Sequence, residues 1–343
     1  MNVVSRSGHC LLGLYALVAM LAGCGGSEQP INALSTTSQN SEIPKAKGKD
    51  FVYVGASLGG TVGSHEAAVE VFSYPKLTFL GTWVDYSDPY GNNGTTGLCS
   101  DTAGNVFALL YQGKVNEIIE FAHGGVSPIN TLLDPDGIPL ACSVDPMTGN
   151  LAVVNAYYTN SPGVLLIYRA ASGSPTTYSD PNLEFYNAGY DGKGNLFLDG
   201  KRRSQGFGLA ELASGGGSFK NINLEKALKS AGIVQWDGAY MTVSDGHVID
   251  RFTVKGERGT IVGSTRLRKP HDPCGSLNCF YGFSPAWIQG DVVVGDVSWC
   301  LLGVPCSGNV GLWHYPRGGR PFRTISPYLT YVPSGLTVSL APK

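Results

Sequence analysis

From Phe51 onward, the chain alternates between short apolar runs and polar turns. One turn recurs: it begins at Asp101, Asp145, Asp191 and Asp237, at intervals of 44, 46 and 46 residues, and an alternating apolar run follows each copy. Alternation with a period of two is typical of a β-strand that buries one face. A repeat in the forties built from short strands predicts a β-propeller, because a four-stranded blade buries both faces only by stacking on its neighbours.

A second repeat predicts the number of blades. A strand that ends in a tight turn occurs six times, at 71–75, 119–125, 167–173, 210–215, 250–256 and 312–319. The segment 51–55 has the phase of a second strand, and the segment 335–340 has the phase of a first strand. The sequence therefore predicts an all-β, six-bladed β-propeller over residues 51–343. We expect the C-terminal strand to close the ring as the inner strand of the first blade, which removes exposed sheet edges.

The repeated turns also carry a resemblance. Asp-x-x-Gly-Asn turns followed by Val-Phe-Ala, Leu-Ala-Val or Leu-Phe-Leu, together with a Tyr-Pro-x-Gly-Gly turn, resemble the NHL-repeat and SMP-30/gluconolactonase-like bacterial propellers. The resemblance implies the fold, and for SMP-30-like lactonases a divalent metal held by glutamate, asparagine and aspartate. That ligand set does not map onto this chain, because 51–57 contains no glutamate. Asp237, beside Trp236 on an expected inner strand, is one candidate carboxylate, although its place in the repeated turn favours a structural role.

The amino terminus predicts export and lipidation. A short segment with one positive charge precedes the apolar stretch 10–20, which is too short to span a bilayer comfortably. It ends in Leu-Ala-Gly-Cys at Cys24, which resembles the bacterial lipobox. We expect residues 1–23 to be a lipoprotein signal peptide, and residues 24–50 to be the lipidated cysteine with a flexible tether. The predicted location is the cell envelope, with a lipid anchor that favours the outer membrane, facing the periplasm or the surface.

Charge excludes one class of partner. The formal net charge is −2, from 24 basic and 26 acidic side chains. No global positive field would attract nucleic acid, so we expect none as a partner. The membrane, through the lipid anchor, and an envelope protein, peptide or carbohydrate ligand are the expected partners.

Candidate ligand-binding residues lie in the loops between second and third strands and between blades, which share one face. This long-loop face mixes aromatic and charged residues, as binding surfaces often do, and solvated loops are the alternative interpretation. The candidates are Asp85, Tyr86, Asp88, Tyr90, Tyr157, Tyr158, Arg202 and Arg203. Lys201–Arg203 with Arg266, Arg268 and Lys269 are a candidate basic patch for an anionic ligand.

The cysteines form two groups. Cys99 and Cys142 have the same phase in the inner strands of successive blades, so either a disulfide between blades or two buried free thiols is expected. The second group is expected to form local disulfides, and a zinc site is the alternative. Its members are Cys274, Cys279, Cys300 and Cys306.

These features favour a binding or interaction module that acts through the long-loop face. We assign no catalytic residue, metal ligand or cofactor, since the chain lacks a Gly-x-Ser-x-Gly elbow, a His-Glu-x-x-His motif, a phosphate-binding loop and an aspartate-rich calcium loop. Two alternatives stay open: a metal-dependent lactonase or hydrolase of the SMP-30-like type, which would need a divalent metal, and a structural scaffold in an envelope assembly.

Overall fold

A computed structural model describes most of the predicted propeller. The described residues are 48–59, 65–85, 94–112, 116–156, 162–203, 206–269, 279–301, 307–325 and 333–342. Within them, only the backbone is described at 57–59, 65–66, 84–85, 279–286, 297–301 and 307. All described strands belong to one compact unit, Thr37–Lys343. The predicted signal peptide and nearly all of the tether lie outside the described residues.

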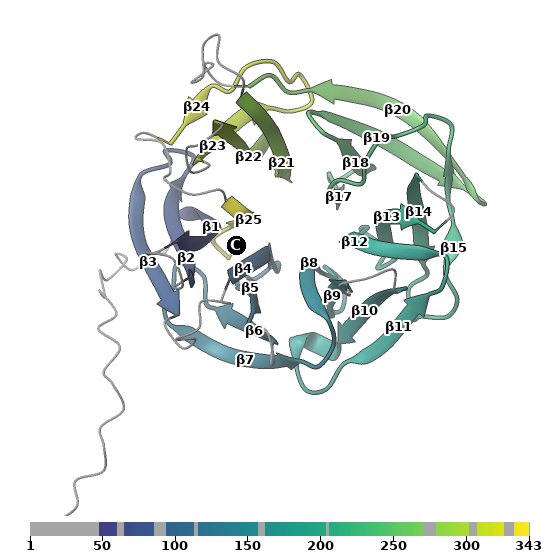
Figure 1. Ribbon diagram of the computed structural model, residues 1–343, viewed down its shortest axis with the longest axis horizontal. Helices are drawn as coiled ribbons and strands as arrows, with labels where there is room; N and C mark the ends of the chain where they lie inside the picture. Colours follow the sequence, from purple (N-terminus) through teal and green to yellow (C-terminus); the bar gives the residue numbers. More distant parts are fainter. Residues whose placement is uncertain are drawn as a thin grey trace, which may run out of the picture. The chain divides into compact units, whose positions relative to one another are not determined.

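Six sheets are arranged around a ring, so the predicted six-bladed β-propeller is confirmed (Figure 1). Blade 1 contains β25 (Pro333–Ser339), β1 (Asp50–Gly59), β2 (His65–Tyr74) and β3 (Phe79–Asp85). Blade 2 contains β4 (Gly94–Ser100), β5 (Val106–Tyr111), β6 (Asn116–Phe121) and β7 (Pro128–Asp134). Blade 3 contains β8 (Ile138–Val144), β9 (Leu151–Ala156), β10 (Gly163–Tyr168) and β11 (Thr176–Asp180), with a 3₁₀ turn η1 (Arg169–Ala171).

The other three blades follow in chain order. Blade 4 contains β12 (Leu183–Tyr190), β13 (Leu196–Arg202), β14 (Phe207–Leu212) and β15 (Lys220–Asn221). Blade 5 contains β16 (Asn223–Leu224), β17 (Val234–Trp236), β18 (Met241–Asp245), β19 (Val248–Lys255) and β20 (Arg258–Arg266). Blade 6 contains β21 (Cys279–Gln289), β22 (Val292–Leu301), β23 (Ser307–His314) and β24 (Arg323–Thr324).

Blade 1 is built from both ends of the described chain. The inner strand β25 pairs with β1 in antiparallel register, from Phe51 opposite Ser339 to Gly55 opposite Gly335. Beyond this ladder, the Ala341 N–H donates to the Asp50 carboxylate at 2.8 Å. The sheet edge that β1 would otherwise expose towards the ring centre is therefore occupied by the last strand.

The recurring aspartate shapes the turn between first and second strands. Asp101 accepts hydrogen bonds from both the backbone and the side-chain amide of Asn105, at 2.8 and 2.9 Å. Asp191 and Asn195 repeat this arrangement. The glycine before each asparagine has a positive φ, at +84° for Gly104, which other residues rarely adopt. The repeat is thus a backbone requirement of the turn.

Asp237 lies in the fourth copy of this turn, just after β17, and not on the inner strand where the sequence placed it. Its Oδ1 accepts the N–H groups of Ala239 and Tyr240, and its Oδ2 accepts the Tyr315 hydroxyl at 2.6 Å. The carboxylate therefore holds a turn and ties blade 5 to blade 6.

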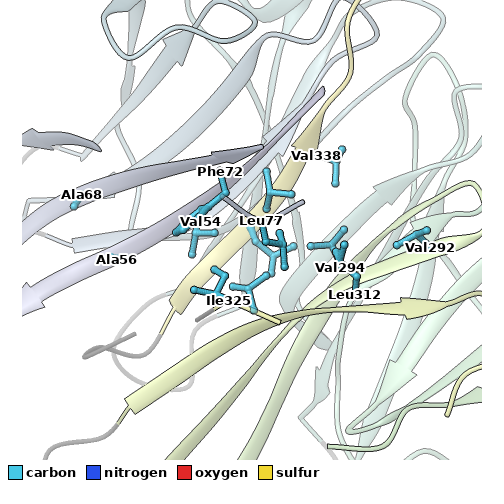
Figure 2. Close-up of a cluster of buried hydrophobic side chains, with 13 residues drawn as sticks. Val54, Ala56, Ala68, Phe72, Leu77, Val292, Val294, Leu312, Ile325 and Val338 are labelled. Carbon is cyan, nitrogen blue, oxygen red and sulfur yellow. The ribbon is translucent and has the colours of Figure 1, made fainter. Parts of the chain in front are cut away.

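The core lies between the blades. Figure 2 shows one interface, where Val54 and Phe72 of blade 1 pack with Val294 and Leu312 of blade 6. Similar clusters join blade 1 to 2, 2 to 3, 3 to 4 and 4 to 5. Both faces of each interior strand contribute, which explains why runs such as Val106–Leu110 are apolar at every position.

Blade 5 departs from the four-stranded unit. The short strand β16 pairs in parallel with β20, while β15, only one residue earlier, belongs to blade 4. The Asn223 N–H donates to Glu257 O at 2.7 Å, and the Glu225 N–H donates to Gly259 O at 3.0 Å. The segment formed by β15 and β16 therefore joins the outer edges of blades 4 and 5.

Candidate functional site

A cavity of about 880 Å³ occupies the centre of the ring. Residues of all six inner strands line it, from β25, β4, β8, β12, β17 and β21. Close approach of these strands depends on glycine: a Cβ on Gly97 would lie 2.6 Å from Leu140 O, and one on Gly335 would lie 2.8 Å from the Gly97 Cα. Small residues at these positions let neighbouring blades meet around the cavity.

Apolar and aromatic side chains make up most of the described wall of the cavity, and polar side chains such as Ser143, Asn187 and Gln289 make up much of the rest. Its larger aliphatic members include Leu98, Leu140, Val144, Ile233, Leu336 and Val338. Tyr190, Trp236 and Trp287 add three aromatic rings from blades 4, 5 and 6. Among the described lining residues, the only acidic side chains are those of Asp101 and Asp296, and no lysine, arginine or histidine is present.

The two aspartates have different surroundings. Asp101 already accepts the two Asn105 hydrogen bonds of its turn. Asp296, in the middle of β22, is only 2% exposed, and its buried Oδ2 accepts no hydrogen bond. Burial raises the pKa of the Asp296 carboxyl from 3.8 to about 8, with a backbone hydrogen bond opposing the shift. A buried acceptor without a donor destabilises the fold, so this carboxyl is an unusual component of the wall.

Ser334 lies on blade 1, which packs against blade 6, and is a second unpartnered group in the wall. Its Oγ is buried without a hydrogen bond, and it belongs to β25 near the long-loop end of that strand. Asp199, by contrast, is fully buried but satisfied: it accepts from Asn187 Nδ2 at 3.0 Å and from the Gly232 N–H at 2.8 Å. Burial raises the pKa of Asp199 to about 7, and these hydrogen bonds oppose the shift.

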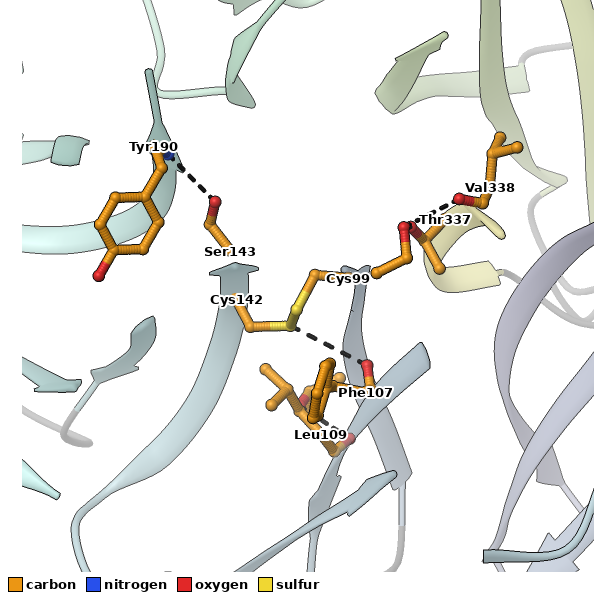
Figure 3. The surroundings of a disulfide bond; sticks show 10 residues. Cys99, Phe107, Leu109, Cys142, Ser143, Tyr190, Thr337 and Val338 are labelled. Atoms are coloured by element: carbon orange, nitrogen blue, oxygen red, sulfur yellow. Dashed lines mark hydrogen bonds between the residues drawn. A yellow bond between two sulfur atoms is a disulfide. The ribbon is translucent and has the colours of Figure 1, made fainter. Parts of the chain in front are cut away.

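A disulfide connects two inner strands at the cavity (Figure 3). Cys99 of β4 and Cys142 of β8 are bonded, with their Cα atoms 5.6 Å apart. Of the two arrangements expected for this pair, the disulfide between blades is confirmed. The sequence signal was the identical strand phase of the two cysteines.

Hydrogen bonds connect further pairs of inner strands. The Tyr190 N–H of β12 donates to Ser143 Oγ of β8 at 3.1 Å (Figure 3). Ser100 Oγ of β4 donates to Val338 O of β25 at 2.8 Å. Gln235 of β17 bonds to the backbone of Ile288 in β21 through both atoms of its amide group. The cavity is thus enclosed by strands that are linked to one another as well as to their own blades.

Most of the predicted ligand-binding residues lie outside the part of the chain that the structure describes. Tyr86, Asp88, Tyr90, Tyr157 and Tyr158 lie outside the described residues, and Asp85 is described only by its backbone at the end of β3.

Arg202 ends β13, where its Nε donates to Phe207 O at 3.3 Å, and the Arg203 N–H donates to Asn182 O. Neither arginine is among the described lining residues of the cavity.

The candidate basic patch is divided between blades 4 and 5. Lys201 belongs to β13, whereas Arg266 ends β20, and its Nη1 lies 2.9 Å from His247 Nε2. The Arg268 N–H donates to Gly319 O at 2.7 Å. The two halves therefore lie on different blades.

The remaining cysteines stay untested. Cys24, Cys274 and Cys306 lie outside the described residues, and Cys279 and Cys300 are described only by their backbone, in β21 and β22.

The described residues include no group of three or more His, Cys, Asp or Glu side chains that could hold a metal ion. In the same part of the chain, no helix is long and apolar enough to cross a membrane.

Sequence reasoning missed Asp296 and Trp287. Asp296 follows Val292–Gly295, an apolar run that looks like an ordinary strand, and its Gly-Asp pair resembles a turn. The useful signal was a carboxylate with apolar neighbours inside a predicted strand. Burying such a carboxylate costs free energy unless it has a partner, so it points to a function.

Comparison with known proteins supports the fold alone, through two solved structures with TM-scores above 0.5. The sequence matches no family model and no curated protein. A solved chain of a nidogen/laminin complex is similar with a TM-score of 0.56 and 11% identity, covering 85% of this chain and 100% of that chain. A protein from Lactobacillus plantarum has a TM-score of 0.51 and 12% identity, covering 85% and 99%. The β-propeller domain of Cps50 (Swd1) from Myceliophteria thermophila has a TM-score of 0.46 and 10% identity, covering 76% and 81%.

Proposed function

We propose that this protein is a lipid-anchored binding module of the bacterial cell envelope, without catalysis of its own. The observation that carries the proposal is the cavity at the centre of the ring, whose described wall is mostly apolar and aromatic, with polar side chains among them. Ligand sites have this composition, and a propeller fold suits a binding or interaction module. Binding through the long-loop face, on which Arg202 and Arg203 lie, is the second part of the proposal.

Two features support the location. Cys24 ends a sequence that resembles a lipobox, after a short apolar stretch. The Cys99–Cys142 disulfide suits an oxidising compartment, such as the periplasm or the cell surface. The Asp-x-x-Gly-Asn turns support a relationship to the NHL-repeat and SMP-30-like propellers within this proposal.

Fractionation of cells tests the anchor. The full chain is expected in the membrane fraction, and Cys24→Ala is expected to lose lipid labelling and membrane attachment. Ser27→Ala, three residues further on, is the matched control and is expected to keep both. Membrane attachment of Cys24→Ala without lipid would contradict the anchor.

Capture of envelope components on the purified full chain tests the binding role. Arg202→Ala together with Arg203→Ala is expected to reduce capture at the long-loop face, whereas Lys193→Ala, in a turn on the opposite end of blade 4, is expected to leave it unchanged. Equal capture by both variants would contradict binding through the long-loop face.

A further inference from the structure

The central cavity contains one buried carboxyl whose chemistry the fold does not use. Asp296 is a wall residue, is 2% exposed, and has an Oδ2 atom without a hydrogen-bond donor. Buried carboxylates in folded proteins are normally paired with a cation or with several donors. Asp199, which is equally buried, shows the usual solution with its two donors. Asp296 Oδ2 lacks such a cation or donor, and a bound ligand can supply it.

Aromatic rings surround the same space. Trp287 pairs with Val294, two residues before Asp296 in β22, so the two side chains lie on the same face of blade 6. Trp236 enters from blade 5 and Tyr190 from blade 4. The face of an aromatic ring attracts a cation through its quadrupole, and the attraction is larger where water is excluded.

The ionisable side chains of the cavity wall favour a positively charged ligand. The described lining residues include two aspartates and no cationic side chain. An anion would be repelled and would find no basic partner there. A divalent metal would require several oxygen ligands, and the described residues include no such cluster.

We propose that the central cavity binds an organic cation, a quaternary or protonated ammonium group with apolar substituents, whose charge pairs with Asp296 while its substituents contact Trp236 and Trp287. The inference rests on the proposed binding function and specifies its ligand class. The apolar wall takes the substituents, and the cavity of about 880 Å³ is large enough for a drug-sized molecule.

Titration of the purified full chain with benzyltrimethylammonium chloride tests the inference, with tryptophan fluorescence as the readout and sodium chloride at equal ionic strength as the reference. Saturable quenching is expected with the ammonium salt and not with sodium chloride. Asp296→Asn preserves the shape of the side chain and removes its charge, and above about pH 8 it is expected to weaken binding at least tenfold.

Asp199→Asn is the matched control, because it changes an equally buried carboxyl that is not part of the described wall. It is expected to keep the affinity, and thermal unfolding checks that both variants fold. Trp287→Leu, a second variant, is expected to weaken binding while Asp296 stays in place.

Several results would overturn the inference: no saturable response, equal affinity in Asp296→Asn, displacement of the ammonium ion by millimolar calcium or magnesium, or equal binding of sodium benzoate. If the ammonium ion fails while envelope capture succeeds, the ligand class is wrong and the binding function stands. If both fail, the proposed function fails as well.

Discussion

The side-chain amide of Gln235 pairs with the backbone of Ile288 as another strand would. Gln235 Nε2 donates to Ile288 O at 3.0 Å, and the Ile288 N–H donates to Gln235 Oε1 at 2.8 Å. Because Gln235 belongs to blade 5 and Ile288 to blade 6, one side chain continues the hydrogen bonding across the gap between two inner strands. Both residues are at least half-buried, so water does not easily replace these bonds.

Gln235→Ala is expected to lower the free energy of unfolding by about 1–3 kcal/mol, because it leaves a buried N–H and a buried carbonyl of β21 without partners. Urea unfolding measures the loss, and hydrogen exchange at the Ile288 amide reports it locally. Gln235→Glu keeps the acceptor and should protect that amide better than Gln235→Ala. Equal exchange rates in the two variants would argue against the paired geometry.

Removing the disulfide is expected to destabilise the propeller. The bond joins residues 43 apart in the sequence, and cross-links of this length restrict the unfolded chain by about 4 kcal/mol in the chain-entropy description. The double variant Cys99→Ala with Cys142→Ala should therefore unfold at a lower urea concentration by an amount equivalent to about 2–4 kcal/mol. Cys142→Ala alone should lose as much as the double variant, since either change breaks the bond. A double variant as stable as the native protein would contradict the prediction.

Stability should fall as the pH rises, through Asp296. Its pKa in the folded protein is about 8, compared with 3.8 for an exposed aspartate, so the folded state holds the proton more tightly than the unfolded state. Its contribution is complete below about pH 4 and decreases as the pH rises to about 8, by at most about 1.4 kcal/mol per pH unit. Asp296→Asn is expected to unfold with a weaker pH dependence, and its advantage over the native protein should grow from pH 5 to pH 8. Parallel stability curves for the two proteins would show that the carboxyl stays ionised.

The affinity of the cavity for a permanent cation should rise with pH, whereas the stability of the protein falls. Benzyltrimethylammonium pairs with the ionised carboxylate, so its affinity is expected to rise by up to tenfold per pH unit below about pH 8 and then level off. The only other ionisable side chains in the described wall are Asp101 and Tyr190, and the pKa of Tyr190 is raised further above its ordinary value by burial. Fluorescence titrations between pH 5.5 and 9 measure the effect. An affinity that does not change with pH, or that changes equally in Asp296→Asn, would assign the response to another group.

Deleting residues 333–343 is expected to abolish cooperative unfolding, because β1 would lose its inner neighbour and expose a strand edge. Deleting only 341–343 is the matched control: it removes the hydrogen bond from Ala341 to Asp50 and should cost about 1 kcal/mol. Circular dichroism during heating distinguishes the two. Cooperative unfolding of the longer deletion would show that blade 1 is stable without β25.

The features that could be predicted from the sequence are those that recur in successive blades, and the features that were missed each occur in only one place. Asp101 and Asp191 recur because each copy of the turn needs the same carboxylate, so their spacing predicts the blades. Cys99 and Cys142 share a phase, which made their bond foreseeable.

The missed features arise from contacts between segments far apart in the chain. Gln235 and Ile288 meet across two blades, and β16 leaves blade 4 to join blade 5. No periodicity predicts these contacts. Asp296 was missed for another reason: it lines a cavity that forms only when the ring of blades closes.

The pairing of β25 with β1 has a consequence for the order of folding. Phe51 lies opposite Ser339, so almost the whole domain separates these two neighbours in the sequence. Closing so long a loop is slow compared with forming hairpins within one blade. Blades 2 to 6 can assemble while synthesis continues, but blade 1 lacks its inner strand until β25 has been synthesised. Until then β1 presents an open edge to other chains, and a chaperone that covers this edge would protect the nascent protein from aggregation.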